Sequence, residues 1–157
     1  MLSTFNRCLG LAILALLPLV AQGDSTSDAQ PESIMTREAI VVVSKSRKIV
    51  AAYSVATAKW SRIELEVPID ARNLTMAKEL VAFQTGRKVY AFSARNGAWS
   101  RLDLPKDSTA TFVLDEAKIW VTDRQSLYVF GIHSTDWAGF DAASGDLIVP
   151  KPGQGGN

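Results

Sequence analysis

The sequence predicts an all-β fold built from three repeats, each of four short antiparallel strands. Two observations carry the prediction. An aromatic residue is followed seven positions later by a tryptophan at three places, Tyr53 and Trp60, Phe92 and Trp99, Phe130 and Trp137, and these tryptophans recur every 39 or 38 residues. Short apolar or alternating runs, separated by polar turns, surround each pair, which is the pattern of strands with one face in a core.

The middle copy, Arg87 to Pro105, shows the pattern most clearly. A β-branched and aromatic run, Val89 to Phe92, is separated from a second run, Trp99 to Leu104, by the dipeptide Asn96-Gly97. Asn-Gly tolerates the positive φ angles of a tight hairpin turn better than most dipeptides. We therefore expect a β-hairpin here, and equivalent hairpins in Arg47 to Pro68 and Gln125 to Ala142.

Two further strands precede each hairpin. The nearer ones are the apolar runs Ile40 to Val43, Leu80 to Phe83 and Ile119 to Val121, and the outer ones are Ile34 to Thr36, Leu74 to Met76 and Thr111 to Leu114. Each repeat thus contains four strands in about 38 to 40 residues. The expected repeats are 34–72, 73–110 and 111–147, together one domain spanning 34–147.

This unit resembles a β-propeller blade, a four-stranded antiparallel sheet. The third and fourth strands of kelch-type blades look like the segment Tyr90-Ala91-Phe92, followed by a turn and Trp99-Ser100-Arg101-Leu102. A second segment, Phe140 to Leu147, is similar to the turn of quinoprotein-like blades. The kelch glycine doublet is missing; its places hold Val42-Val43, Ala82-Phe83 and Trp120-Val121. The resemblance implies three propeller-like blades.

Closed propellers usually have four to eight blades, so three blades leave faces and edges open. The sequence is compatible with a homodimer of six blades, which we favour, with a partial propeller completed by a partner, and with a piece of a longer protein. A monomer in which the strands curl into a sandwich or barrel is a further alternative.

The N-terminal stretch predicts a secretory signal peptide over residues 1–23. Arg7 precedes an apolar run, Leu9 to Val20, and Ala21-Gln22-Gly23 provides small residues for cleavage before Asp24. The run is shorter than the roughly 20 apolar residues of a membrane span, which disfavours an uncleaved anchor. We expect a secreted or periplasmic protein with a flexible leader at 24–33 and a disordered, Pro/Gly-rich tail at 148–157.

Composition argues against several classes of partner. The chain has 17 basic and 16 acidic residues, and Arg7 and the single cysteine, Cys8, lie in the predicted signal peptide. Without a basic block, nucleic acid and anionic membranes are poor partners. Once the predicted signal peptide is removed, no cysteine remains and His133 is the sole histidine, so the usual transition-metal ligand sets are lacking. We expect no metal and no cofactor.

Three residues are candidates for ligand contact: Trp120, His133 and Asp136. Trp120 lies outside the register of the other tryptophans, which we expect to pack between blades. His133, Ser134 and Asp136 share one predicted turn, and we expect local backbone hydrogen bonds there. A hydrolase triad instead converges from distant segments.

We therefore expect a binding or scaffold protein that acts through loops at one end of the blades, with a protein or carbohydrate ligand. The alternative is a glycan-acting hydrolase or lyase with Glu64, Asp103 or Asp141 as acid and base. Such an enzyme needs paired carboxylates about 5 to 9 Å apart. The sequence shows no catalytic constellation, so we favour the binding role.

Overall fold

A computed structural model describes residues 31–150 and confirms the all-β prediction. The strands of this described part form three antiparallel sheets of four, four and five strands, and its helical content is a single 3-10 turn, η1 (Ala71–Asn73). Within each sheet every strand pairs with its neighbour in sequence. The sheets in residues 31–150 do not close into a barrel, because each keeps two edge strands.

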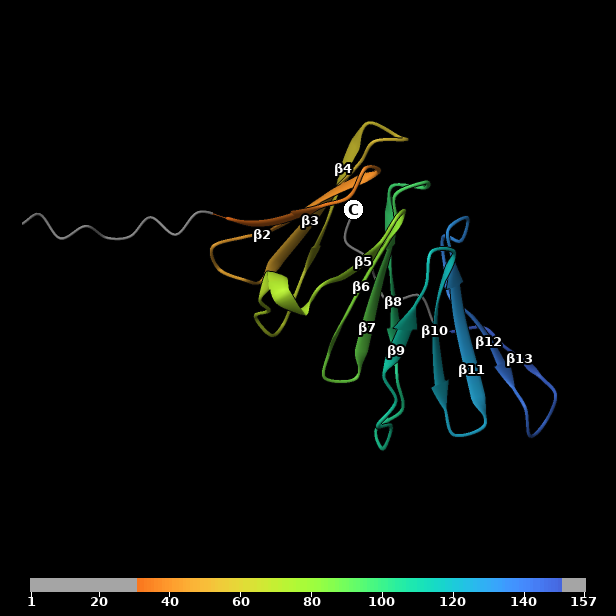
Figure 1. Cartoon of the computed structure of the whole chain (residues 1–157). Helices are drawn as coiled ribbons and strands as arrows, with labels where there is room; N and C mark the ends of the chain where they lie inside the picture. Colours follow the sequence, from red (N-terminus) through yellow and green to blue (C-terminus); the bar gives the residue numbers. More distant parts are fainter. Residues whose placement is uncertain (1–30, 151–157) are drawn as a thin grey trace, which may run out of the picture.

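The first and second sheets have equivalent layouts (Figure 1). The first contains β1 (Glu32–Met35), β2 (Ala39–Val43), β3 (Ile49–Ser54) and β4 (Lys59–Glu64). The second contains β5 (Thr75–Ala77), β6 (Leu80–Thr85), β7 (Lys88–Ser93) and β8 (Ala98–Asp103).

The third sheet contains β9 (Phe112–Leu114), β10 (Lys118–Asp123), β11 (Ser126–Gly131), β12 (Ala138–Asp141) and β13 (Leu147–Ile148). Its fifth strand, β13, is not among the predicted strands, and it includes Ile148, which corrects the predicted start of the tail at residue 148. β1 likewise begins at Glu32, within the predicted leader. The predicted signal peptide, residues 24–30 of the leader and residues 151–157 of the tail lie outside the described part of the chain.

Strand register explains the seven-residue spacing. Tyr53 pairs with Trp60 and Phe92 with Trp99 on adjacent strands. The ring centroids of these pairs lie 5.4 Å and 5.1 Å apart, and those of Phe130 and Trp137 lie 5.6 Å apart. Cross-strand aromatic pairs of this kind stabilise a sheet. The offset of seven therefore places two rings side by side in every repeat.

The central hairpin forms as predicted, but its turn is longer than a tight Asn-Gly turn. The last strand pair is Ser93 and Ala98, so the turn spans the four residues from Ala94 to Gly97. Gly97 has a φ of 65°, whereas Asn96 is not among the positive-φ residues. In the first repeat Ala58, with a φ of 52°, occupies the place of Gly97.

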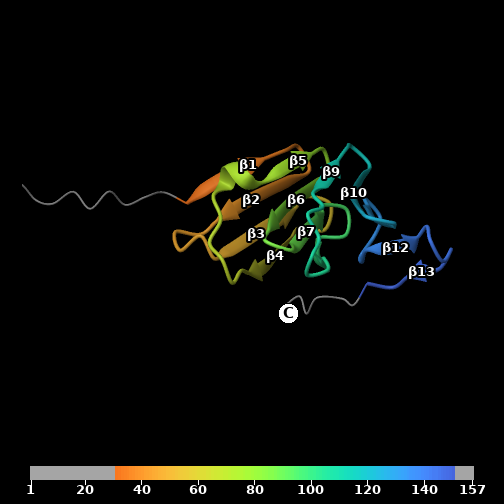
Figure 2. The same ribbon diagram turned by 90° about the horizontal axis from the view of Figure 1, so that it is seen from below.

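The three sheets stack in sequence order, with the second between the other two (Figures 1 and 2). We call the side of each sheet that carries the aromatic pair its tryptophan face, and the other side its opposite face. The tryptophan face of the second sheet packs on the opposite face of the first, forming one core. The tryptophan face of the third packs on the opposite face of the second, forming another.

Hydrogen bonds between neighbouring sheets fix this stacking at one end of the molecule. Ser54 Oγ, in β3, donates to the carbonyl of Ala94, and Ser93 Oγ, in β7, donates to that of Ile132. Both serines are fully buried. Each bond reaches the first residue of the next hairpin turn, so the β3–β4, β7–β8 and β11–β12 turns line up. We call this end of the molecule the turn end.

Candidate functional site

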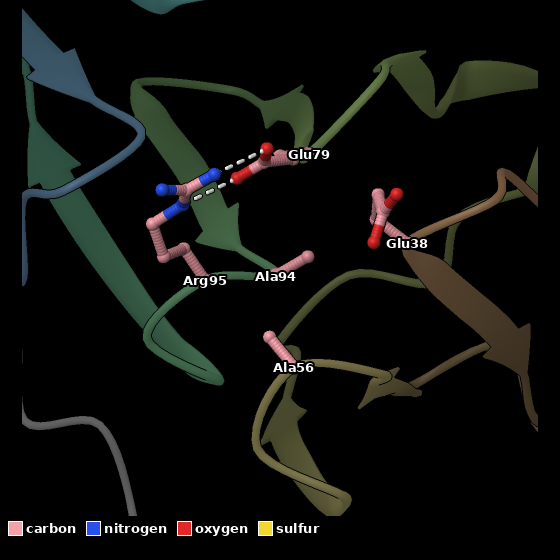
Figure 3. Close-up of a pocket in the computed structure, with 5 residues that line it drawn as sticks. All are labelled: Glu38, Ala56, Glu79, Ala94 and Arg95. Carbon is pink, nitrogen blue, oxygen red and sulfur yellow. Dashed lines mark hydrogen bonds and ion pairs between the residues drawn. The ribbon is translucent and has the colours of Figure 1, made fainter.

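A pocket of about 240 Å³ lies at the turn end, between the first and second sheets (Figure 3). Glu38 and Glu79 stand just before β2 and β6, Ala56 lies in the β3–β4 turn, and Ala94 and Arg95 lie in the β7–β8 turn. The pocket is therefore built from the same turns of two neighbouring repeats. Sequence reasoning did not single out any of its five residues.

Glu79 and Arg95 form a two-pronged ion pair on one side of the pocket. Arg95 Nε donates to Glu79 Oε2 and Arg95 Nη2 to Glu79 Oε1, both at 2.8 Å. The Glu79 side chain is only 11% exposed. The hydrogen bond from Arg95 lowers the pKa of Glu79 despite its burial, and the same bond raises the pKa of Arg95. Both groups are charged at neutral pH, in a geometry that favours fixed orientation.

Glu38 holds the same place in the first repeat, because its carbonyl accepts from Val55 N–H as that of Glu79 accepts from Ala94 N–H. Ala56 then stands where the second repeat has Arg95. In residues 31–150 no hydrogen bond or ion pair engages the half-buried Glu38 carboxylate, which stands apart from the dashed contacts in Figure 3. Its charge nevertheless contributes to the raised pKa of Arg95. The pocket thus presents an open carboxylate beside a closed ion pair.

The predicted contact residues His133 and Asp136 also lie at the turn end, exposed in the β11–β12 loop. Ala117 O accepts from Ile132 N–H, so His133 occupies the third-repeat place of Arg95. Asn96 Nδ2 donates to Ser134 O at 2.9 Å, which joins this loop to the β7–β8 turn. Ser134 Oγ accepts from Gly131 N–H at 3.1 Å, a local turn bond of the predicted kind.

Trp120 lies elsewhere. Its neighbours Ile119 and Val121 are fully buried in the core against the second sheet, so the half-buried Trp120 is on the opposite face of the third sheet. Lys118 Nζ stands 5.2 Å from the centre of its ring. The structure therefore does not bring Trp120 together with His133 and Asp136.

The expectation that the three repeated tryptophans pack between sheets holds for two of them. Trp99 is half-buried against the first sheet and Trp137 is 5% exposed in the second core. Trp60 is 57% exposed, which corrects the expectation for the first repeat. The reason is its position, because no sheet within the described residues packs on the tryptophan face of the first sheet.

The carboxylates of the enzymatic alternative lie in three different sheets. Glu64 is exposed at the end of β4, Asp103 Oδ2 accepts from Arg101 at 3.0 Å, and Asp141 Oδ1 accepts from Ala143 N–H at 2.8 Å. Within residues 31–150, no hydrogen bond or ion pair joins any two of these sheets through Glu64, Asp103 or Asp141. Residues 31–150 also contain no group of three His, Cys, Asp or Glu side chains placed to hold a metal ion. In the same range no helix has the length and apolarity to cross a membrane.

No protein-family model and no curated protein matches this chain. Among solved structures it is similar to Hsv2 of Kluyvelomyces marxianus, with a TM-score of 0.32 and 13% sequence identity. The alignment covers 73% of this chain and 49% of that one, so the chain spans about half the length of Hsv2. This likeness is too weak to assign a family.

Proposed function

We propose that the chain is a secreted or periplasmic binding or scaffold protein of propeller-like repeats, and that it binds its ligand at the turn end. The observation that carries the proposal is the pocket between the first two sheets, where the Glu38 carboxylate lies open beside the Glu79–Arg95 pair. Loops held by a rigid scaffold are common binding sites. The proposed location rests on the signal-like N-terminal sequence.

The propeller-like assignment is supported by the repeated packing. Each of the three sheets is a meander of consecutive strands, and the tryptophan face of the second and third sheets covers the opposite face of the sheet before it. Face-to-face succession of four-stranded meanders is the arrangement of blades in a propeller.

The chemistry of the pocket favours a ligand that donates hydrogen bonds. An ionised carboxylate accepts hydrogen bonds only, and Glu38 has no internal donor among the described residues. Sugar hydroxyls and the ammonium or guanidinium groups of a protein both supply such donors. The ligand class is therefore a carbohydrate or a protein segment that places a donor beside Glu38 and hydrogen-bond acceptors beside Arg95.

The test is a binding comparison between matched variants. The purified protein is screened on a glycan array and against a cell-envelope extract, and affinity is then measured for each molecule retained. Glu38→Gln is expected to weaken binding about tenfold or more, as loss of a charged hydrogen bond does. Glu64→Gln makes the same substitution at an exposed carboxylate outside the pocket and should leave binding unchanged. Absence of any retained ligand, or equal affinity for both variants, would refute the proposal.

A further inference from the structure

The two internal interfaces of the chain use the same two kinds of face. In the first core, Phe92 and Trp99 pack over the opposite face of the first sheet, where Val50, Ala52 and Ile63 are buried. In the second core, Phe130 and Trp137 pack over the equivalent residues of the second sheet, Val89, Ala91 and Leu102. One rule therefore describes both contacts: a tryptophan face covers the opposite face of the preceding sheet.

The first sheet carries a tryptophan face that covers nothing in the described chain. Tyr53 and Trp60 are cross-strand partners with their rings 5.4 Å apart, like the pairs inside the two cores. Trp60 is 57% exposed, and Met35, on the same face of β1, is 68% exposed. By contrast, the equivalent Trp99 and Trp137 are half-buried and buried.

The third sheet carries an opposite face that nothing in residues 31–150 covers. The residues equivalent to Val89, Ala91 and Leu102 are Leu127, Val129 and Phe140, and Leu127 pairs directly with Phe140. Leu127 is 39% exposed and Phe140 42%, and Val113, beside Trp120 on the same face, is 48% exposed. A contiguous apolar surface of this kind marks an interaction site.

These two surfaces are the two halves of the contact that the chain makes twice internally. They lie on the outer sides of the first and third sheets, with the second sheet between them (Figures 1 and 2), so they do not meet within one chain. A second copy of the chain presents both missing halves. Because the two halves differ, the contact is heterologous, and reciprocal contacts of this type close a ring when the rotation permits.

We infer that two copies of this chain associate head to tail, the opposite face of each third sheet packing on the tryptophan face of the partner's first sheet. Both contacts together close a ring of six sheets. In each contact a tryptophan face covers the opposite face of another sheet, as in the two internal cores. Phe140 and Leu127 of one copy pack against Trp60 and Tyr53 of the other. This inference concerns the outer sheets and stands whether or not the turn-end pocket binds a ligand.

The experiment measures absolute mass in solution by light scattering on a sizing column, at two concentrations. The purified wild-type protein is expected to have the mass of two copies. Trp60→Glu and Phe140→Glu are each expected to give the mass of one copy, because either change damages both contacts of the ring. Val67→Glu is the matched control, since Val67 is 58% exposed in the loop after β4, and should keep the mass of two copies.

Mixing the two face variants gives the decisive result. In a mixed pair, one contact carries both substitutions and the other carries neither, so an equimolar mixture of Trp60→Glu and Phe140→Glu is expected to recover the mass of two copies. Circular dichroism verifies that each variant keeps its strands. A wild-type mass of one copy, or of more than two, overturns the inference. So does a two-copy mass that persists in folded Phe140→Glu, because the pair would then form through another surface.

Discussion

Gly97 of the β7–β8 turn lies directly against Thr57 of the β3–β4 turn, and a Cβ atom at Gly97 would stand 2.5 Å from Thr57 Oγ1. Gly97 also has a φ of 65°, in the left-handed region that favours glycine. Glycine is therefore favoured at this position for two separate reasons: the positive φ of its backbone and the lack of space for a Cβ atom between the sheets. The contact joins the same turns that line the pocket.

Gly97→Ala is expected to lower the free energy of unfolding by about 2 to 3 kcal/mol, from φ strain and the clash together. Gly86→Ala is the matched control, because Gly86 has a φ of 55° but nothing within 4 Å of its added Cβ. It should cost about 1 kcal/mol. Urea denaturation measures the free energy of unfolding of both variants. Equal losses of stability would show that the close approach of the two turns does not affect stability.

The serine bonds between sheets give a second prediction. Ser93→Ala removes the donor to the Ile132 carbonyl and leaves that acceptor without its buried partner. The expected loss is about 1 to 3 kcal/mol in the free energy of unfolding. Ser46→Ala, in an exposed turn where Ser46 Oγ contacts only local groups, should change it by less than about 0.5 kcal/mol. Similar losses from the two variants would contradict a structural role for the bond.

The Glu79–Arg95 pair should matter more to stability than a surface ion pair. Arg95→Ala leaves the Glu79 carboxylate, 11% exposed, without its two hydrogen bonds. Because Arg95 itself is 48% exposed, solvent screens part of the interaction, and we expect a moderate but detectable loss in the free energy of unfolding. Arg72→Ala removes a partner of Asp70 that is 84% exposed, and thermal unfolding should detect almost no effect.

Sequence reasoning reached the fold because the repeat signal is local. The seven-residue offset between Phe92 and Trp99 indicates that the two residues pair across adjacent strands. The alternation of apolar and polar residues indicates which side of a strand is buried. Short segments of sequence are therefore enough to predict the strands and the repeats. Trp60 has the same local pattern as Trp99, yet it is exposed, because burial depends on whether another sheet is stacked on it. No window of the sequence contains that information.

The pocket could not be predicted for a related reason. Glu38 and Arg95 come from turns of different repeats, and only the stacking of the sheets places them in one pocket. A weak signal exists, since Glu38-Ala39-Ile40-Val41 and Glu79-Leu80-Val81-Ala82 both set a glutamate before a buried strand. Aligning the repeats on β2 and β6 instead of on the tryptophans reveals it. The β2–β3 connection is longer than the β6–β7 connection, and this shifts the glutamates out of the tryptophan register.

Acid should weaken the third sheet through Asp115, in the β9–β10 turn. Asp115 Oδ2 accepts from Lys118 Nζ at 2.7 Å, and Oδ1 accepts from the N–H groups of Ala117 and Lys118. The bond from Lys118 and these backbone bonds lower the pKa of Asp115 from 3.8 to about 2. The folded state thus binds this proton less readily than the unfolded state. The resulting stabilisation is complete above about pH 4 and is lost as the pH falls toward 2.

Asp115→Asn keeps an oxygen acceptor at this turn but removes the titrating group. The variant is expected to be less stable than the wild type at pH 7, and the difference between the two should shrink between pH 4 and pH 2. Asp107→Asn is the control, because Asp107 is exposed and its carboxylate makes no hydrogen bond or ion pair within residues 31–150. The difference in stability between this variant and the wild type should stay nearly constant with pH. Urea midpoints at pH 7, 4, 3 and 2 measure both differences. A gap between wild type and Asp115→Asn that stays constant down to pH 2 would mean that the turn bonds do not hold the Asp115 carboxylate in its charged form.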